Sequence, residues 1–212
     1  FVRSGLEAVA AHGQTAWGID EGISRDQLGE ILRQEGRGRV FDNWLLEHNA
    51  FTKARVAQCV AVYRRHKPTL TLFAEAHAFL SRYSSSFRLY LVTDGNKIVQ
   101  KNKVEALKLS RYFQRVFLTH NFGLSASKPS LRCFEIIRRI ENCSWDEIVY
   151  VGDNPAKDFV GLNRVGARTV RVRTGNYASV KAPSDFDAAE SIPTLSSLPH
   201  LLGLPPTVAV DP

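Results

Sequence analysis

The chain has 212 residues, 44% of them hydrophobic, and its 28 Lys and Arg outnumber its 21 Asp and Glu to give a formal net charge of +7. This length and composition predict one α/β domain with a modest insertion. No stretch is long and apolar enough to cross a membrane, and the positive charge forms no basic stripe with interleaved aromatics, so we expect neither a membrane nor a nucleic acid as partner.

The cysteines give a prediction about the cellular compartment. Cys59, Cys133 and Cys143 are odd in number and form no C-x-x-C motif. This pattern favours reduced, mostly buried thiols in a cytoplasmic protein. The dispersed surplus of positive charge fits a mild field around a site for small anionic ligands, although most of these charges are interpreted as solvated surface.

Residues 1–67 have the pattern of a helical bundle. Leu6, Val9 and Ala10 follow the i, i+3, i+4 spacing of an amphipathic helix. Ser24 with Gln27 has the spacing of a capping box, which predicts a helix start at that point. The glycines and arginines of residues 36–39 indicate a loop, and no strand pattern interrupts the region.

From Pro68 onward, strand and helix patterns alternate. Leu72, Phe73, Ala76, Phe79 and Leu80 predict a helix that faces the core. Strands are expected at residues 88–93, 116–119, 147–151 and 169–172. Helices are expected at 97–109, after Lys128 and up to Val165. The helix after Lys128 has an apolar face formed by Leu131, Phe134, Ile137 and Ile140. A short strand and helix follow from Ile192, and residues 205–212 are expected to be a flexible tail. This alternation predicts a Rossmann-like parallel sheet with helices on both faces.

Residues with useful chemistry follow two of these strands. The first strand ends in Thr93, and Asp94 and Gly95 come next. A hydroxyl beside several backbone N–H groups at a strand end can hold phosphate oxygens, although Asp-Gly is also a common β-turn sequence. Residues 147–151 end at Gly152, with Asp153 directly after it and Asp158 expected early in a helix begun by Pro155. Both acids therefore fall where open α/β sheets place their ligands, while turn formation and helix capping remain the competing interpretation.

A lysine between these strands completes the set. Lys128 precedes Pro129 and a predicted amphipathic helix, so an extended backbone is expected there. In this order, Thr93, Lys128 and the pair Asp153 and Asp158 resemble motifs two, three and four of the haloacid dehalogenase-like hydrolases. The resemblance covers roughly residues 69–180, including the stretch from Gly161 through Gly166 into the following strand. Each motif alone is weak, and the ordered set carries the resemblance.

The family's first motif, a strand ending in Asp-x-Asp, has no counterpart in this sequence. Asp20 has no apolar strand before it, Asp42 lies in a helical context, and Asp185 and Asp187 come after the last motif. No nucleophile is therefore assigned. Since the family places this strand before its cap, and the sequence starts at Phe1 without Met, we expect the nucleophile upstream of Phe1.

The resemblance implies a function and a role for each residue. It implies a Mg²⁺-dependent phosphatase of small phosphomonoesters, either sugar phosphates or nucleotides, that works through an aspartyl-phosphate. Thr93, with the N–H groups of Asp94 and Gly95, would hold phosphate oxygens, and Lys128 would neutralise the phosphoryl group and the nucleophile. Asp153 would bind Mg²⁺, and Asp158 would join the metal through water or hold Lys128.

The same resemblance implies an organisation in three parts. Residues 1–67 would be a helical cap, 68–204 the Rossmann-like core and 205–212 a tail, with the cap closing over the site to choose the leaving group. Two alternatives are a metal-independent dehalogenase of small haloacids and a non-catalytic regulatory or binding protein with the same fold. The pair Asp153 and Asp158 favours the metal-dependent enzyme.

Overall fold

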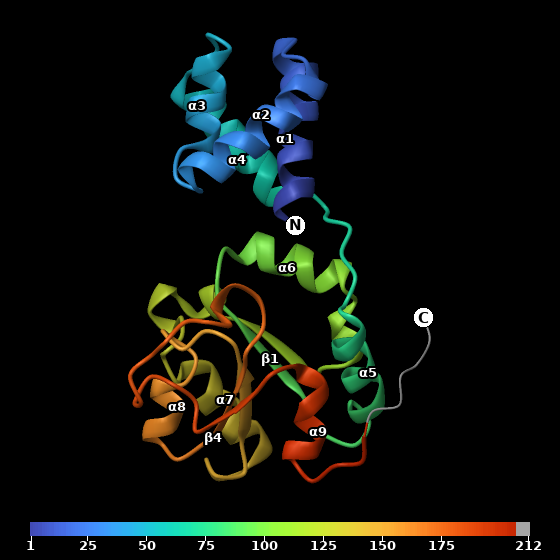
Figure 1. Ribbon diagram of the computed structural model, residues 1–212, viewed down its shortest axis with the longest axis vertical. Coiled ribbons are helices and arrows are strands. Elements are labelled where there is room, and N and C mark those ends of the chain that lie inside the picture. Colours follow the sequence, from blue (N-terminus) through green and yellow to red (C-terminus); the bar gives the residue numbers. More distant parts are fainter. Residues whose placement is uncertain (207–212) are drawn as a thin grey trace. The chain divides into compact units, whose positions relative to one another are not determined.

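Four helices make up the first third of the chain. The computed structural model describes residues 1–206, and Figure 1 shows these helices in blue to teal. They are α1 (Val2–Trp17), α2 (Glu21–Glu35), α3 (Val40–Glu47) and α4 (Lys53–Arg65). They surround a core of aliphatic side chains and the fully buried indole of Trp44. The prediction of a helical region without strands is confirmed for these residues.

Local side-chain contacts decide where the helices begin. The Asp20 carboxylate accepts the Ile23 N–H at 2.8 Å and caps α2, and the Thr52 hydroxyl caps α4 through the Arg55 N–H. The predicted capping box at Ser24 is therefore wrong, because the helix starts three residues earlier at Glu21. Ser24 is instead buried inside α2, and its hydroxyl donates to the Asp20 carbonyl at 2.6 Å.

The remaining chain alternates between strands and helices. The helices are α5 (Ala74–Tyr83), α6 (Lys97–Ala106), α7 (Arg132–Glu141), α8 (Val160–Arg164) and α9 (Leu198–Leu201). The strands are β1 (Tyr90–Thr93), β2 (Arg115–Leu118), β3 (Val149–Gly152), β4 (Arg168–Val172) and β5 (Glu190–Ile192). All observed pairings are parallel, which confirms the predicted α/β class.

Packing divides the chain into two compact units. One comprises residues 1–71 and 98–108, and the other comprises residues 72–97 and 109–212. The expected cap boundary near Pro68 stays a prediction. Helix α6 groups with the helical unit, where the Asn102 side chain donates to the carbonyl of His66 at 2.9 Å and so ties α6 to the end of α4.

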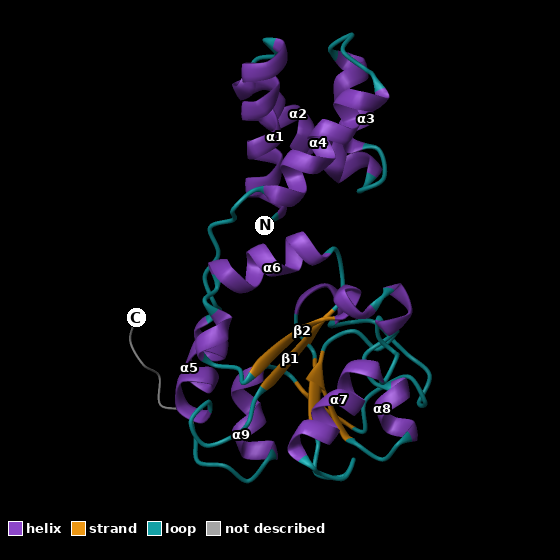
Figure 2. Cartoon of the chain, turned by 180° about the vertical axis from the view of Figure 1, so that it is seen from behind, coloured by secondary structure: helices purple, strands orange, loops and turns teal. Residues whose placement is uncertain are grey.

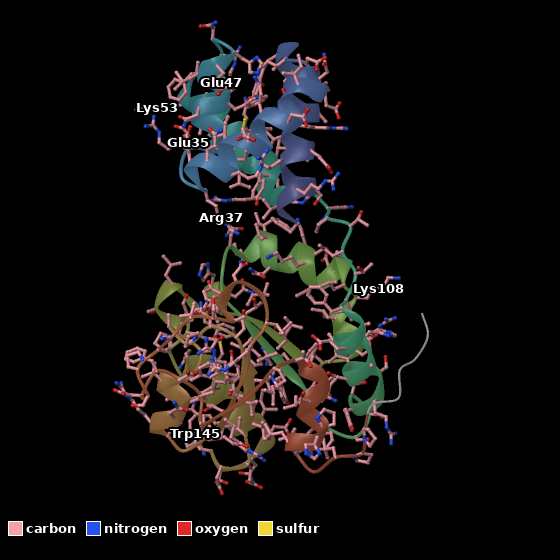
Figure 3. The ribbon with its side chains drawn as sticks, in the orientation of Figure 1. Glu35, Arg37, Glu47, Lys53, Lys108 and Trp145 are labelled. Carbon is pink, nitrogen blue, oxygen red and sulfur yellow. The ribbon has the colours of Figure 1, made fainter. Side chains whose placement is uncertain are left out.

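Both faces of the strands carry apolar clusters. On one face, Phe134 and Ile137 of α7 pack with Phe117 of β2 and Leu162 of α8. On the other face, α5 and α9 pack against Val170, Val172 and Ile192. Trp145, labelled in Figure 3, lies in the turn before β3, where the Arg138 guanidinium stacks over its ring at 5.4 Å. Packing on both faces is the usual reason why strands of a parallel sheet have apolar sequences.

The strands form two separate groups, which Figure 2 shows in orange. Among residues 1–206, β1 pairs with β2 alone, while β3 begins a second sheet of order β3-β4-β5. Tyr90, Leu91 and Val92 are only partly buried, and Val149 of β3 is 41% exposed, whereas Val170 of β4 is fully buried. Strands of a parallel sheet are normally buried on both faces, so β1 and β3 have the character of edge strands.

Some predicted details differ from the structure. Phe73 is 81% exposed because it lies at the residue before α5, outside the helical stripe, and Ile140 is 51% exposed at the end of α7. The helix expected from Pro155 begins only at Val160. Residues 154–158 form a turn, because the Asn154 side chain accepts the Ala156 N–H and its carbonyl accepts the Asp158 N–H. Such local bonds compete with helix formation.

A buried arginine fixes the loop after β4. The Arg171 side chain is 0% exposed, pairs with Asp187 at 2.8 Å and donates to the carbonyls of Tyr177 and Val180. Asp187, part of the Asp-x-Asp that was not assigned as a nucleophile, thus neutralises a buried charge. In the described residues, no helix is long and apolar enough to cross a membrane. The predicted tail lies largely outside the described residues.

This ion pair gives a stability prediction. Asp187→Ala is expected to lower the free energy of unfolding by about 3 kcal/mol, because it leaves the Arg171 guanidinium buried without its counter-charge. Asp185→Ala is the matched control, since Asp185 is exposed two residues away. Urea unfolding of both variants measures the difference, and equal free energies for the two would show that the pair does not hold the loop.

Candidate active site

The predicted site residues follow the carboxyl ends of neighbouring strands. Thr93 ends β1, and Asp94 and Gly95 follow it, with Gly95 at a φ of 126° that favours glycine. Lys128 follows β2 after two short turns, and Asp153 follows β3 directly. Strands are parallel within each group, and contacts of Lys128 with Asp158 and of Asp94 with Lys157 join the carboxyl ends of the two groups, which is where α/β proteins bind ligands.

Lys128 and Asp158 form a buried ion pair. The ammonium Nζ lies 2.8 Å from Asp158 Oδ1, and the two side chains are 10% and 2% exposed. The same ammonium donates to the hydroxyl of Tyr150 at 3.0 Å, and that hydroxyl donates to Asp158 Oδ1 at 3.2 Å. Burial, followed by the charge of Asp158, raises the pKa of Tyr150 well above its ordinary value, so the phenol keeps its proton.

Asp158 also fixes the backbone at the end of β3. Its Oδ2 accepts the N–H of Asn154 at 2.8 Å and the N–H of Asp153 at 3.2 Å. Every strong acceptor position of this carboxylate therefore faces a donor of the protein. These contacts fit a residue that holds Lys128 and the turn in place.

The close approach of Asp158 explains the glycine that ends β3. A Cβ on Gly152 would lie 2.7 Å from Asp158 Oδ2 and 3.0 Å from its Cγ, so a side chain there displaces the carboxylate. Gly152→Ala is expected to cost about 1–3 kcal/mol of unfolding free energy. Gly29→Ala, in a helix with nothing within 4 Å of the added Cβ, is the control and is expected to gain about 0.5–1 kcal/mol. Thermal or urea unfolding measures both changes in stability. A Gly152→Ala variant more stable than the wild type would contradict the predicted clash between the added Cβ and Asp158.

Asp94 connects the two groups of strands. Its Oδ1 accepts the Thr119 hydroxyl at 2.9 Å and the backbone N–H of Lys128 at 3.2 Å, and its Oδ2 lies 3.1 Å from Lys157 Nζ. Burial alone would raise the pKa of Asp94, but these donors outweigh it and lower the pKa. The carboxylate therefore stays ionised and anchors Lys128 by its backbone, at the peptide before the cis Lys128–Pro129 bond.

Asp153 differs from the other two acids. Within residues 1–206, no other residue is found to form a hydrogen bond or ion pair with its carboxylate, and its backbone N–H is bound by Asp158. Partial burial and then the nearby charge of Asp158 raise the pKa of Asp153. An ionised carboxylate that no other residue of the described chain neutralises by an ion pair, next to a second carboxylate, is an arrangement that a cation would stabilise.

These residues fit a magnesium ion only as part of a larger set of ligands. The described residues contain no group of three or more His, Cys, Asp or Glu side chains that could hold a metal. Mg²⁺ is commonly bound by one or two carboxylates, with water and substrate phosphate supplying the other oxygens. Asp153 matches such a ligand, whereas Asp94 and Asp158 already face cationic or N–H donors.

The structure thus brings the predicted residues to one place. Lys128 contacts both Asp158 and Asp94, Asp153 adjoins Asp158, and Thr93 lies beside Asp94, its carbonyl 3.3 Å from the Thr119 hydroxyl. Three further residues at the site were not predicted: Thr119, Lys157 and Tyr150. Thr119 comes at the end of a predicted strand, and this position is the feature of the sequence that could have identified it as a site residue. Nothing in the local sequence distinguishes Tyr150 from a packing aromatic.

Comparisons with known proteins find similar sequences. The family profile described as haloacid dehalogenase-like hydrolase matches residues 41–172. A glyceraldehyde 3-phosphate phosphatase of Methanopyrus kandleri is 34% identical over 191 residues, which cover 82% of this chain and 77% of that protein. A phosphoserine phosphatase of Thermus thermophilus is 30% identical over 140 residues, which cover 66% of this chain and 55% of that protein.

Two solved structures share the fold. A HAD-hydrolase from Bacillus subtilis, YfnB, solved with bound magnesium, superposes with a TM-score of 0.63 at 18% identity, covering 95% of this chain and 92% of that one. A 2-haloacid dehalogenase from Pseudomonas syringae pv. tomato superposes with a TM-score of 0.62 at 20% identity, covering 95% of this chain and 91% of that one. At these identities the likeness concerns the fold alone.

Proposed function

The chain belongs to the haloacid dehalogenase-like hydrolases, and on this basis we propose that it hydrolyses small phosphomonoesters in a Mg²⁺-dependent reaction. The observation that carries the proposal is the buried Lys128 ammonium, which pairs with Asp158 close to the carboxylate of Asp153, while Asp94 holds the Lys128 backbone N–H. A cation and a metal-binding carboxylate at one sheet edge match what a phosphoryl group requires.

Each residue has a proposed role. Thr93, with the backbone N–H groups of Asp94 and Gly95, binds phosphate oxygens, as turns after strands commonly do. Lys128 neutralises charge on the phosphoryl group. Asp153 is the residue that would hold Mg²⁺, which supplies further charge neutralisation when bound. The contacts of Asp158 favour the second of its two predicted roles, the positioning of Lys128, over a water-mediated role at the metal.

The proposed nucleophile is an aspartate on a strand that this sequence does not include. Within residues 1–206, β1 and β3 each have one edge with no strand partner. Asp94 and Lys128 link the carboxyl ends of β1 and β3, so a further parallel strand between them would end at the site. An aspartate at its tip would attack phosphorus, break the ester P–O bond and displace the alcohol, and water would then hydrolyse the aspartyl-phosphate to inorganic phosphate and the free aspartate.

The proposed substrate is a short sugar phosphate, with nucleotides as the second choice. The relatives from Methanopyrus kandleri and Thermus thermophilus are named for three-carbon monophosphates, and the former covers most of this chain. We propose residues 1–67 as a cap that chooses the leaving group. A cytoplasmic setting is supported by the three free cysteines, of which Cys59 and Cys133 are buried.

The experiment is an assay of the full-length protein, including whatever precedes Phe1. Phosphate release is measured with glyceraldehyde 3-phosphate, phosphoserine and nucleoside monophosphates, each with Mg²⁺ and with EDTA. We expect turnover of at least one substrate that EDTA abolishes. Halide release from 2-chloropropionate without metal would identify a dehalogenase instead, and no turnover of any compound would favour a regulatory protein.

A further inference from the structure

The Lys128 ammonium contacts a tyrosine hydroxyl as well as its counter-ion Asp158. An ammonium has three N–H donors and no acceptor. Among the described residues, it forms an ion pair with Asp158 Oδ1 at 2.8 Å and donates a hydrogen bond to the Tyr150 hydroxyl at 3.0 Å. These two contacts leave at least one N–H for a ligand and restrict the direction in which it points.

Tyr150 closes this arrangement into a triangle. Its hydroxyl accepts from Lys128 and at the same time donates to Asp158 Oδ1 at 3.2 Å. Two neighbouring rings hold the phenol in position: Phe134 lies edge-on at 5.2 Å between ring centroids, and Phe159 lies at 6.2 Å. The hydroxyl consequently cannot move away from Lys128 without displacing the core cluster that contains Phe134.

We propose that Tyr150 is a positioning residue that aims the Lys128 ammonium at the phosphoryl group. Asp158 alone leaves the ammonium free to rotate about its contact with one oxygen. The Tyr150 hydroxyl, as a second acceptor, removes that freedom and presents the third N–H in one direction. A preorganised donor stabilises charge that develops in a transition state better than one that must first reorient. This inference rests on the proposed function of Lys128.

The first test compares Tyr150→Phe with Tyr90→Phe in the full-length protein. Tyr90 is the matched control, because its partly buried hydroxyl also donates to a carboxylate, that of Glu141. Tyr90 begins β1 and therefore lies at the end of that strand opposite to Thr93. We expect Tyr150→Phe to lower kcat about tenfold or more with KM changed less than about twofold, and Tyr90→Phe to keep kcat within about twofold. Tyr150→Phe should have a somewhat lower unfolding midpoint than Tyr90→Phe, because it also removes an acceptor of the Lys128 ammonium, and both variants should remain folded at the assay temperature.

The second test needs no turnover. NMR of the lysine ammonium groups measures the exchange of Lys128 protons with water. We expect this exchange to be at least about tenfold faster in Tyr150→Phe than in the wild type, and unchanged in Tyr90→Phe. A wild type without phosphatase activity would overturn the proposed function, and the exchange rates would then still judge the positioning of Lys128. Wild-type exchange and wild-type kcat in Tyr150→Phe would overturn the inference.

Discussion

Lys128→Met is expected to lower kcat about 10²–10³-fold, the usual effect of removing one preorganised donor from a site that stabilises developing negative charge. Methionine keeps a flexible apolar stem of similar length and removes the ammonium. The Asp158 carboxylate, 2% exposed, then stays buried without its counter-charge. The free energy of unfolding should therefore also fall by about 3–5 kcal/mol. Phosphate release and urea unfolding measure the two effects.

Two further variants separate charge burial from catalysis. Lys101→Met is the control, because Lys101 forms an exposed pair with Glu105 at 3.7 Å and should change the unfolding free energy by less than about 0.5 kcal/mol. In the double variant Lys128→Met with Asp158→Asn, both charges are absent, so much of the stability should return while activity stays low. If the double variant were no more stable than Lys128→Met, the unpaired charge of Asp158 would not explain the stability lost in Lys128→Met.

Asp153→Asn is expected to lower kcat about 10²–10³-fold, as Lys128→Met does, without destabilising the protein. Asparagine keeps the shape of the side chain but loses the charge that the proposed metal requires. The pKa of Asp153 is raised by partial burial and by Asp158, so ionisation of Asp153 costs the folded state free energy. That cost is absent below the unfolded pKa of about 3.9 and fully present above the raised folded pKa. Measured in EDTA near neutral pH, the variant should therefore be at least as stable as the wild type.

The pH dependence provides the check on this reasoning. As the pH falls from the raised folded pKa of Asp153 toward about 3.9, the difference in unfolding free energy between wild type and Asp153→Asn should shrink, and below that pH it should be absent because Asp153 is protonated in both states. Asp185→Asn, an exposed aspartate outside the site, is the control for turnover. A variant that retained wild-type turnover would remove Asp153 from the proposed chemistry, and one that unfolded more readily would contradict the raised pKa.

The elements that depend on local pattern could be predicted from the sequence. The apolar runs that end at Thr93 and Gly152 were placed as strands because buried parallel strands are apolar along their whole length. Their parallel alignment placed Thr93 and Asp153 at one edge. The positions of helix starts were less predictable. Asp20 and Ser24 are both good capping residues, and only the fold shows that Asp20 is used.

The contacts that make up the site could not be predicted from local sequence patterns. Asp158 was expected in a helix, but its carboxylate binds the N–H groups of Asp153 and Asn154, which no propensity scale describes. The meeting of Lys128 with Asp158 and Tyr150 joins residues 30 and 22 positions apart. Strand periodicity shows that Tyr150 alternates in orientation with Val151, but not that its hydroxyl meets an ammonium.

The most direct measurement is a crystal structure of the full-length protein with Mg²⁺ and tungstate, a phosphate analogue with strong anomalous scattering. The account predicts tungstate within hydrogen-bond distance of Lys128 Nζ and the Thr93 hydroxyl, and Mg²⁺ on the carboxylate of Asp153. Tungstate bound away from the carboxyl ends of β1 and β3, or a metal that leaves Asp153 without a ligand, would contradict it.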